Sequence, residues 1–400
     1  MPAELIDLEA ARAQVLAAVR ERLAAEPVPL PRALGRVLAD DVVAGDDVPG
    51  FDNSAMDGFA VRAADTAGAP VDLPLAGESR AGHPATAPLP PGAAMAISTG
   101  AMLPEGADAV VRVEDTAPRD GAVEVRVPVE AARHVRRAGE DVATGSTVLR
   151  AGARLGPAEL GVLASVGVAE ASCTRRPRVA VLTTGDELVG PGEPRRPGGV
   201  RDTNGVSLTG LALEAGAELA SAARVADEPE ATTTALRAGL RADVVVACGG
   251  VSVGTHDHVR PALEELGVEP AFWGVALRPG KPTWFGTHGD TLVFGLPGNP
   301  VSAMVTFHLF VRPALLALAG AVEHRAVVPA VMDEPYAKAP GRAHAVRCAL
   351  EARDDGWHVR PTGPQGSHVL TSMLGAGALA VLPAERGDVA AGERVEIELL

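Results

Sequence analysis

The feature that most constrains the fold is an alternation of apolar strands and helices between residues 178 and 322. Strands are predicted at about 178–183, 218–225 and 244–247, with helices at about 205–214 and 229–240. Gly216 suits the end of the first helix, and Pro229 suits the first turn of the second. Strands that alternate with helices form parallel sheets covered on both faces. Residues 178–322 therefore predict a three-layer α/β domain with a parallel sheet.

Acidic residues follow the predicted strands of this domain, where parallel sheets bind their ligands. They are Asp186, Glu187, Asp227 and Asp257. We expect the four carboxylates to converge at one edge of the sheet, because the carboxyl ends of parallel strands meet there. Carboxylates opposite phosphate-binding amides are what Mg²⁺ with a polyanion requires. For any one of these acids alone, a role as a helix cap or turn residue explains the sequence equally well.

Two glycine-containing loops are predicted at the same edge. The first, at residues 249–254, leads into a helix predicted over about 257–266. The second, at 296–302, places Asn299 as a helix cap before an apolar helix over about 301–316. Glycine lets backbone amides approach an anion, and a helix start adds the positive end of a dipole. The loop residues expected to bind the ligand are Gly249, Gly250, Ser252, Gly254, Pro297, Gly298, Asn299, Pro300 and Ser302.

A cationic turn lies between the two loops. Arg278, Gly280 and Lys281 occur in Arg-Pro-Gly-Lys-Pro, whose prolines stiffen the turn. Either loop alone is most simply an ordinary turn, but two loops with two cations between them favour a phosphate-rich small molecule. Neither is a Walker loop, because no Gly-Lys-Ser/Thr follows the glycines, and neither has the spacing of a dinucleotide fingerprint.

Charge and cysteine content limit the partners and the compartment. The formal net charge of −15 predicts no nucleic-acid partner, so local cations must hold an anionic ligand. Cys173, Cys248 and Cys348 are far apart and odd in number, which favours a reducing compartment over a disulfide framework or zinc site. Cys248 is interpreted as a small buried residue rather than a nucleophile. The acidic N-terminus does not resemble a signal peptide and no apolar stretch of about 18 residues is apparent, so we expect a cytoplasmic protein without a membrane partner.

The rest of the chain predicts three further domains. A discontinuous helical/linker domain spans 1–45 and 140–177, and apolar residues between Leu8 and Leu23 lie on one face of a helix that packs on its own core or on a partner subunit. Residues 46–139 combine short strands with glycines and prolines and predict an inserted β-rich domain. Residues 323–400 predict a C-terminal β domain that is a small barrel or sandwich.

Seven motifs occur in an order that identifies a family. They are Asp-Asn-Ser-Ala-Met-Asp-Gly (52–58), Ser-Thr-Gly-Ala (98–101), Arg-Ala-Gly-Glu-Asp (137–141), Thr-Gly-Asp-Glu-Leu (184–188), Gly-Gly-Val-Ser-Val-Gly (249–254), Pro-Gly-Lys-Pro (279–282) and Leu-Pro-Gly-Asn-Pro-Val-Ser (296–302). Over nearly its whole length the chain resembles the molybdopterin molybdenumtransferases, which insert molybdenum during molybdenum cofactor biosynthesis.

The resemblance implies a fold, a reaction and an assembly. The α/β domain would be like that of molybdopterin adenylyltransferase, within an elongated homodimer whose active cleft includes a domain of the partner subunit. The reaction would take adenylylated molybdopterin and molybdate with Mg²⁺, and release AMP and the molybdenum cofactor. Molybdopterin adenylyltransferase and molybdoenzyme apoproteins are the further partners implied.

The resemblance also assigns roles to residues. Asp57 and Thr99 would come from the β-rich domain as catalytic residues, and Arg347 and Ser367 would bind substrate from the C-terminal domain. Glu187, Asp227 and Asp257 would be the metal ligands. Asp186 would join these three acids in the catalytic set. Breaking a phosphoanhydride needs positioning and charge neutralisation, which Arg278, Lys281 and the loop amides would supply.

Three positions depart from the family pattern. Arg278 stands where lysine is more usual, which keeps the charge but adds a planar fork. Thr255-His256 replaces a stretch that often carries an acid, which bears on the Mg²⁺ environment, and Cys348 follows Arg347 where glycine is common.

Two other functions are compatible with an α/β domain of this type. One is an adenylyltransferase that uses ATP and leaves molybdate alone, but that activity needs only the α/β domain and would not explain residues 46–139 or 323–400. The other is a non-catalytic binding or scaffolding protein, against which the full set of acids argues.

Overall fold

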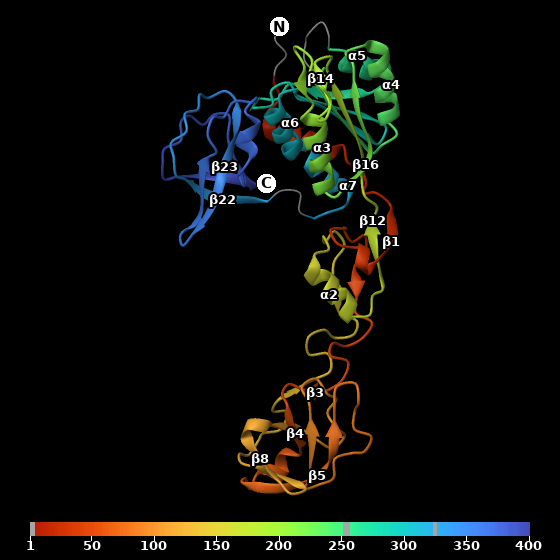
Figure 1. Ribbon diagram of the computed structural model, residues 1–400, viewed down its shortest axis with the longest axis vertical. Coiled ribbons are helices and arrows are strands. Elements are labelled where there is room, and N and C mark those ends of the chain that lie inside the picture. Colours follow the sequence, from red (N-terminus) through yellow and green to blue (C-terminus); the bar gives the residue numbers. More distant parts are fainter. Residues whose placement is uncertain (1–4, 251–256, 323–325) are drawn as a thin grey trace.

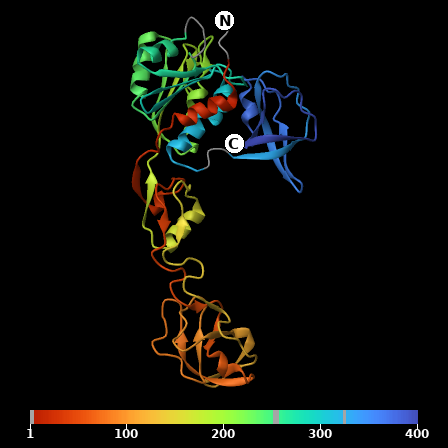
Figure 2. The same ribbon diagram turned by 180° about the vertical axis from the view of Figure 1, so that it is seen from behind.

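The structure, a computed structural model, describes residues 5–250, 257–322 and 326–400 of the 400-residue chain. The molecule is elongated (Figure 1). An α/β domain and a C-terminal β domain lie side by side at one end, and an inserted β-rich domain lies at the other. A small connecting unit lies between the two ends and contains both the outgoing and the returning chain (Figure 2).

The α/β domain contains the strands and helices that the sequence predicts, together with further strands that it did not. Its sheet has the order β16-β13-β17-β21-β20-β18. The elements are β13 (Arg178–Thr184), β14 (Leu188–Val189), β15 (Val200–Arg201), α3 (Asn204–Glu214), β16 (Glu218–Val225), α4 (Pro229–Gly239), β17 (Val244–Cys248), α5 (Val259–Glu265), β18 (Glu269–Trp273), β20 (Trp284–His288), β21 (Thr291–Leu296), α6 (Pro300–Thr306), the π-helix η4 (Phe307–Val311) and α7 (Arg312–Leu318).

The sheet is mixed rather than wholly parallel, which corrects the sequence prediction. Strands β16, β13, β17 and β21 pair in parallel, whereas β20 pairs antiparallel with both β21 and β18. The reason is the tight turn between β20 and β21, where Gly289 has a φ of 59°. Strands joined by so short a turn form a hairpin and must run antiparallel.

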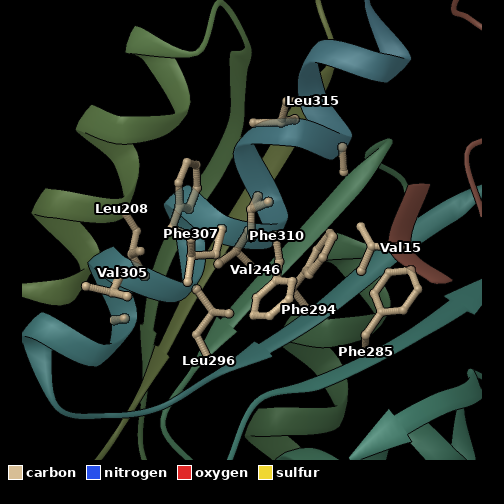
Figure 3. Packing of buried hydrophobic residues seen from close by; sticks show 14 of the residues in the cluster. Val15, Leu208, Val246, Phe285, Phe294, Leu296, Val305, Phe307, Phe310 and Leu315 are labelled. Atoms are coloured by element: carbon tan, nitrogen blue, oxygen red, sulfur yellow. The ribbon is translucent and has the colours of Figure 1, made fainter. Parts of the chain in front are cut away.

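Helices cover both faces of this sheet and give the three layers. Along β17, Val244 and Val246 face a cluster that includes residues of α1, α3, α6, η4 and α7, whereas Val245 and Ala247 face α4 and α5. Figure 3 shows Val246, Phe294 and Phe310 in the first cluster. Complete burial of such a side chain contributes about 1.5–3 kcal/mol. The alternation along β17 thus packs helices on both faces of the sheet.

Helix α1 (Leu8–Ala17) packs on the α/β core and not on the connecting unit. Asp7 caps it, because its Oδ1 accepts a hydrogen bond from the N–H of Glu9 at 2.8 Å. The predicted apolar face is present, with Leu8 and Val15 buried beside α7. The prediction grouped this helix with a linker domain over 1–45, but its buried face joins the α/β domain.

One helical run is long and apolar enough to cross a membrane by length and composition, which differs from the sequence-based expectation. It spans Pro300–Leu318, with 19 residues and a mean hydropathy of 1.7. Of its apolar window, 83% is buried inside the protein. It is the central core helix of the α/β domain, running through α6, η4 and α7.

The connecting unit is built from pairs of outgoing and returning segments. They are β1 (Ala25–Pro29) with β12 (Glu170–Thr174), β2 (Val42–Val43) with β11 (Thr147–Leu149), and β3 (Asn53–Ser54) with β10 (Val135–Arg136), together with η1 (Leu30–Arg32) and α2 (Pro157–Ser165). All three strand pairs are antiparallel, because the chain leaves and returns along the same path.

The two remaining domains are β structures. The inserted domain has the order β7-β4-β6-β5-β9-β8 and contains β4 (Gly58–Val61), η2 (Ala63–Thr66), β5 (Val71–Ser79), β6 (Ala94–Ile97), β7 (Ala109–Arg112), η3 (Val113–Asp115), β8 (Thr116–Arg119) and β9 (Ala122–Val125). The C-terminal domain contains β22 (Val327–Met332), β23 (Ala343–Arg353), β24 (Gly356–Pro361), η5 (Leu370–Met373), β25 (Ala378–Leu382) and β26 (Glu393–Leu399). Because β23 also pairs with β25, its sheet closes, and the domain is a barrel.

Candidate functional site

Two of the predicted acids form a pair at the carboxyl edge of the sheet. Asp186 follows β13 and Asp227 follows the neighbouring β16. The N–H of Asp227 donates to Asp186 Oδ1 at 3.1 Å, and the N–H of Asp186 donates to Asp227 Oδ2 at 3.3 Å. These reciprocal bonds hold two carboxylates next to each other, and the Arg196 guanidinium donates to the carbonyl of Asp186.

The other two acids lie on loops at the same edge. Glu187 is exposed and directly follows Asp186. Asp257 lies just before α5, after the loop that leaves β17, and β17 is the other parallel neighbour of β13. All four acids thus follow neighbouring parallel strands, as the sequence pattern predicts, although their assignment as catalytic residues remains a prediction.

The loop after β17 lies against the end of β13 because it begins with glycine. Gly249 and Gly250 have φ values of 92° and 61°, which other residues rarely adopt. A Cβ at Gly249 would lie 2.7 Å from the carbonyl oxygen of Thr184. The N–H of Gly249 donates to the carbonyl of Leu296 at 3.2 Å, which joins this loop to the end of β21. Ser252, Gly254, Thr255 and His256 lie outside the described residues.

A polar contact made by Asn204 joins the two loops and α3. Asn204, the first residue of α3, donates through Nδ2 to the carbonyl of Gly298 at 2.7 Å and approaches Cys248 Sγ at 3.2 Å. The Cys248 thiol lies 3.2 Å from the carbonyl of Pro297. Complete burial raises the pKa of Cys248 to about 12, so it stays a thiol. The interpretation of Cys248 as a buried packing residue is therefore supported.

The second loop starts α6, with one difference from the prediction. Pro300 occupies the first helical position as expected. Asn299 occupies the cap position, but its side chain makes no capping hydrogen bond, and its carbonyl accepts the N–H of Ala303 at 3.0 Å. Ser302 is buried, and its carbonyl accepts the Thr306 hydroxyl at 2.7 Å.

The cationic turn packs on α6 and joins the α/β domain to the barrel. A Cβ at Gly280 would lie 2.5 Å from Thr306 Cγ2, so the approach requires glycine. Strand β19 (Leu277–Arg278) pairs in parallel with β23 and places Arg278 beside His344. Arg278 and Lys281 are both exposed, and neither has an ion-pair partner within the described parts of the chain. Two cations without an ion-pair partner in the described parts of the chain therefore lie on a turn that packs against Thr306, the last residue of α6.

Arg347 holds a loop of the barrel. Its side chain is 0% exposed, and Nε donates to Ser372 Oγ at 3.1 Å. The terminal nitrogens donate to the carbonyls of Pro364, Gln365 and Gly366, each at 3.3 Å. The guanidinium of Arg347 therefore donates its hydrogen bonds to other residues of the barrel. The predicted role of Arg347 in substrate binding stays a prediction. The carbonyl of Ser367 accepts the N–H of Val301 at 3.2 Å, which brings this loop to the start of α6.

Asp57 and Thr99 form a contact of their own in the β-rich domain. Asp57 Oδ1 accepts the N–H of Thr99 at 2.7 Å and its hydroxyl at 3.0 Å. These hydrogen bonds lower the pKa of Asp57, so it is ionised at neutral pH. Both residues are exposed, and within one chain they lie at the opposite end of the molecule from the acids of the sheet (Figure 1).

The donor set at the sheet edge suits Mg²⁺ shared with a substrate. Across residues 5–250, 257–322 and 326–400, no group of three or more His, Cys, Asp or Glu residues could by itself hold a metal ion. The adjacent carboxylates of Asp186 and Asp227 are oxygen ligands of the kind Mg²⁺ uses, and Mg²⁺ commonly completes its shell with water and phosphate oxygens. The ligand set Glu187, Asp227 and Asp257 remains a prediction.

Several residues of the site were not found from the sequence. Asp202 accepts the Thr183 hydroxyl at 2.8 Å and the N–H of Gly205 at 2.9 Å, and thereby fixes the turn that carries Asn204. The signal was present, because Asp202-Thr-Asn-Gly is a run of turn and cap residues before a predicted helix. The sequence contains no comparable signal for Gln365. Its side-chain amide forms hydrogen bonds with the backbone of Arg347, and no local pattern predicts that contact.

Comparison with known proteins agrees with this geometry. Three family descriptions match in sequence: the MoeA N-terminal region (domain I and II) at residues 6–167, the probable molybdopterin binding domain at 180–317, and the MoeA C-terminal region (domain IV) at 329–400. The fold and site therefore define a multidomain protein built around a molybdopterin-binding α/β domain.

Relatives that match nearly the whole chain identify the family within this class of protein. Molybdopterin molybdenumtransferase of Haemophilus influenzae is 39% identical over 399 residues, covering 98% of each chain. Molybdopterin molybdenumtransferase 2 of Mycobacterium tuberculosis is 39% identical and covers 92% of this chain and 94% of its own. The crystal structure of the molybdopterin biosynthesis moeA protein from Pyrococcus horikoshii OT3 matches with a TM-score of 0.85 at 30% identity, over 99% of this chain and 100% of that one. The chain belongs to the MoeA family of molybdopterin molybdenumtransferases.

Proposed function

We propose that the chain transfers molybdenum from molybdate to adenylylated molybdopterin in a Mg²⁺-assisted reaction that releases AMP. The general activity, insertion of molybdenum into molybdopterin, follows from the family to which the chain belongs. The observation that carries the finer proposal is that cations and loops share the carboxyl edge of the sheet that bears the acids. Exposed Arg278 and Lys281 lie on the segment between β18 and β20, and the Asn299 loop follows β21. The N–H of Val301 joins the Asn299 loop to the Ser367 loop of the barrel.

The chain's own residues would act mainly by holding charge in place. Arg278 and Lys281 would neutralise phosphate or molybdate oxygens, with amides of the loops at Gly249 and Gly298 as further donors. Asn204 would keep the carbonyls of that second loop turned away from the anion, because it donates to Gly298. No covalent nucleophile is needed for cleavage of a phosphoanhydride, and Cys248 has the wrong pKa and no exposure for that role.

Mg²⁺ is part of the proposal. When bound, it would supply positive charge that offsets the charge developing on the leaving phosphate. Asp186 and Asp227 hold each other's carboxylates in place, so Asp227 would present an oxygen ligand, and Glu187 and Asp257 are the further ligands proposed. A requirement for the substrate phosphate would explain why the protein ligands alone form no closed metal site.

A homodimer with a shared site is also proposed. Asp57 and Thr99 lie in the β-rich domain, which the connecting unit holds away from the α/β domain of the same chain (Figure 2). They can therefore serve the sheet edge only if that edge belongs to a second subunit. Molybdopterin adenylyltransferase, which would supply the substrate, and molybdoenzyme apoproteins, which would accept the product, are the proposed further partners. The three free, buried cysteines support a reducing, cytoplasmic location.

The proposal is tested by incubating purified protein with adenylylated molybdopterin, molybdate and Mg²⁺ while AMP release is followed. We expect AMP to appear only when all three are present. AMP release without molybdate would contradict coupled insertion, and formation of adenylylated molybdopterin from ATP and molybdopterin would favour the adenylyltransferase alternative.

A further inference from the structure

A cavity of about 520 Å³ lies where the connecting unit meets the end of the α/β domain. The turn at residues 150–154 forms one wall, and Arg312 and Leu316 of α7 form another. The turn is held against the segment after α7, because the N–H of Val322 donates to the carbonyl of Gly152 at 3.3 Å. Gly152 has a φ of 85°, and a Cβ there would lie 2.6 Å from Val322 Cγ2. The cavity is therefore a built junction between two parts of the fold.

Three arginines line this cavity without a carboxylate partner. They are Arg150, Arg154 and Arg312. Among the residues that the structure describes, none of the three forms an ion pair, and Arg154 donates only to a backbone carbonyl, that of Glu214, at 3.4 Å. Glu159 also lines the cavity, but its Oε2 accepts the N–H of Gly156 at 2.9 Å. Three like charges are thus gathered together in a protein whose net charge is −15.

Arg312 is half-buried in the wall of the cavity, close to another cation. Burial, followed by the charge of Arg154, lowers the pKa of Arg312, while Glu214 and Glu398 act in the opposite direction. The Arg312 guanidinium has no hydrogen-bond acceptor among the described residues. An anion in the cavity would supply the missing acceptors.

We propose that this cavity binds a diphosphate group, with Arg150, Arg154 and Arg312 as its ligands. Guanidinium forks match phosphate oxygens in pairs, and three of them balance the charge of a diphosphate. The volume lies within the range of about 300–1,000 Å³ that is usual for small-molecule sites. Leu316 and Val322 provide apolar surface for an uncharged part of the ligand. Since the walls belong to different parts of the fold, binding would stiffen the junction that carries the β-rich domain.

Titration calorimetry with two probes, inorganic pyrophosphate and ADP, tests the site in the full-length protein. The sheet edge is itself expected to bind phosphate, so the measurement is made on two complementary variants. The first, Arg278→Ala/Lys281→Ala, removes the cations of the sheet edge. The second, Arg150→Gln/Arg154→Gln/Arg312→Gln, removes those of the cavity. Arg237→Gln, an exposed change on α4, is the matched control, and unfolding temperatures show whether each variant is folded.

We expect the sheet-edge variant to keep one site per chain and the cavity variant to lose that site, with affinity falling at least tenfold. Binding at the cavity should also weaken as salt is raised, because two of its arginines are exposed. Tighter binding of ADP than of pyrophosphate would show that the apolar wall contacts the nucleoside, and equal binding would identify the diphosphate alone as the ligand. The proposal is overturned if the sheet-edge variant binds neither probe, or if the cavity variant binds like the Arg237→Gln control.

Discussion

At the scale of single residues, the site contains two kinds of polar side chain with different tasks. Arg278 and Lys281 are exposed and carry charge to the sheet edge. Asn204 and Arg347 are inward-facing and use their donors on backbone carbonyls of the loops. The sequence predicted the exposed cations, because charge beside glycine and proline has a direct interpretation. The substrate-binding role of Arg347 stays a prediction, and the sequence could not show its bonds to the barrel loop, because only the fold shows which acceptors surround a guanidinium.

The acid that we expect to act most directly on the reaction is Glu187. Replacing it with alanine should lower kcat at least tenfold and change KM for adenylylated molybdopterin much less, because a metal ligand acts mainly on charge that develops in the transition state. Steady-state AMP release in saturating Mg²⁺ measures both constants. Glu230→Ala, an exposed change in the first turn of α4, is the control. A kcat for Glu187→Ala equal to that of the control would remove Glu187 from the catalytic set.

The molybdate dependence should identify the role of Arg278. Its planar fork matches two oxygens of a tetrahedral anion, whereas Lys281 is a point charge. We expect Arg278→Ala to raise the molybdate concentration for half-maximal turnover at least tenfold, a loss of about 1.4 kcal/mol. Arg278→Lys, which restores the residue more usual in the family, should keep most of the activity.

The alternative is that Arg278 has only a surface role, which would be worth under about 1 kcal/mol. The absence of an ion-pair partner among the described residues already argues against a simple surface salt bridge. Titration of molybdate at fixed adenylylated molybdopterin, with Arg237→Ala as the control, decides between the two. An unchanged molybdate dependence in Arg278→Ala would remove it from the anion site.

At the scale of elements, the sequence predicted the helices and three of the parallel strands of the α/β domain, because buried parallel strands and capped helices leave strong local signals. The strands at 178–184 and 244–248 and the helix at 229–239 are close to their predicted bounds. The antiparallel β20 was missed because a single glycine turn at 289 reverses the chain. Pairing of β19 with β23 could not be predicted either, since two residues carry no periodicity and their partner lies in another domain.

That pairing makes the junction between domains sensitive to pH. Burial lowers the pKa of His344 to about 4, with nearby Arg278 the next cause, and Nδ1 lies 3.1 Å from the Tyr336 hydroxyl. An unfolded histidine has a pKa of about 6.5, so between these values the unfolded state binds more protons and the free energy of unfolding rises with pH. Stability from neutral His344 is therefore complete above about pH 6.5 and is lost as the pH falls toward 4, by up to about 3 kcal/mol.

Hydrogen exchange of the amides of β23 measures this effect. After correction for intrinsic exchange rates, we expect protection to fall between pH 7 and pH 5 in the natural chain. His344→Gln keeps a polar side chain that does not titrate, so its protection should change much less over the same interval. Equal losses in the two proteins would show that other groups cause the pH dependence.

At the scale of the whole molecule, the separation of the predicted catalytic residues is the central fact. Asp57 and Thr99 contact each other in the β-rich domain, whereas Glu187 and Asp227 belong to the α/β domain at the other end of the molecule (Figure 1). The sequence motifs identified both pairs of residues but gave no distance between the pairs. No local pattern predicts the direction in which the connecting unit places the β-rich domain. The elongated shape turns the predicted shared site into a geometric requirement: the two groups can act together only across two subunits.

Mixing two inactive variants tests this requirement. Asp57→Ala and Glu187→Ala should each be inactive as homodimers, whereas a heterodimer has one site with both changes and one site with neither. After subunit exchange we therefore expect activity to return to about one quarter of the natural level, because half of the dimers are mixed and each has one intact site. Differently tagged subunits, recovered through both tags, confirm exchange and isolate the heterodimer for AMP-release assays.

Mixing Asp57→Ala with Thr99→Ala is the matched control, since both changes fall in the same half-site and no intact site can form. No recovery in a purified Asp57→Ala/Glu187→Ala heterodimer would place both residues in the site of a single chain, and recovery in the control would show that Asp57 and Thr99 serve different sites.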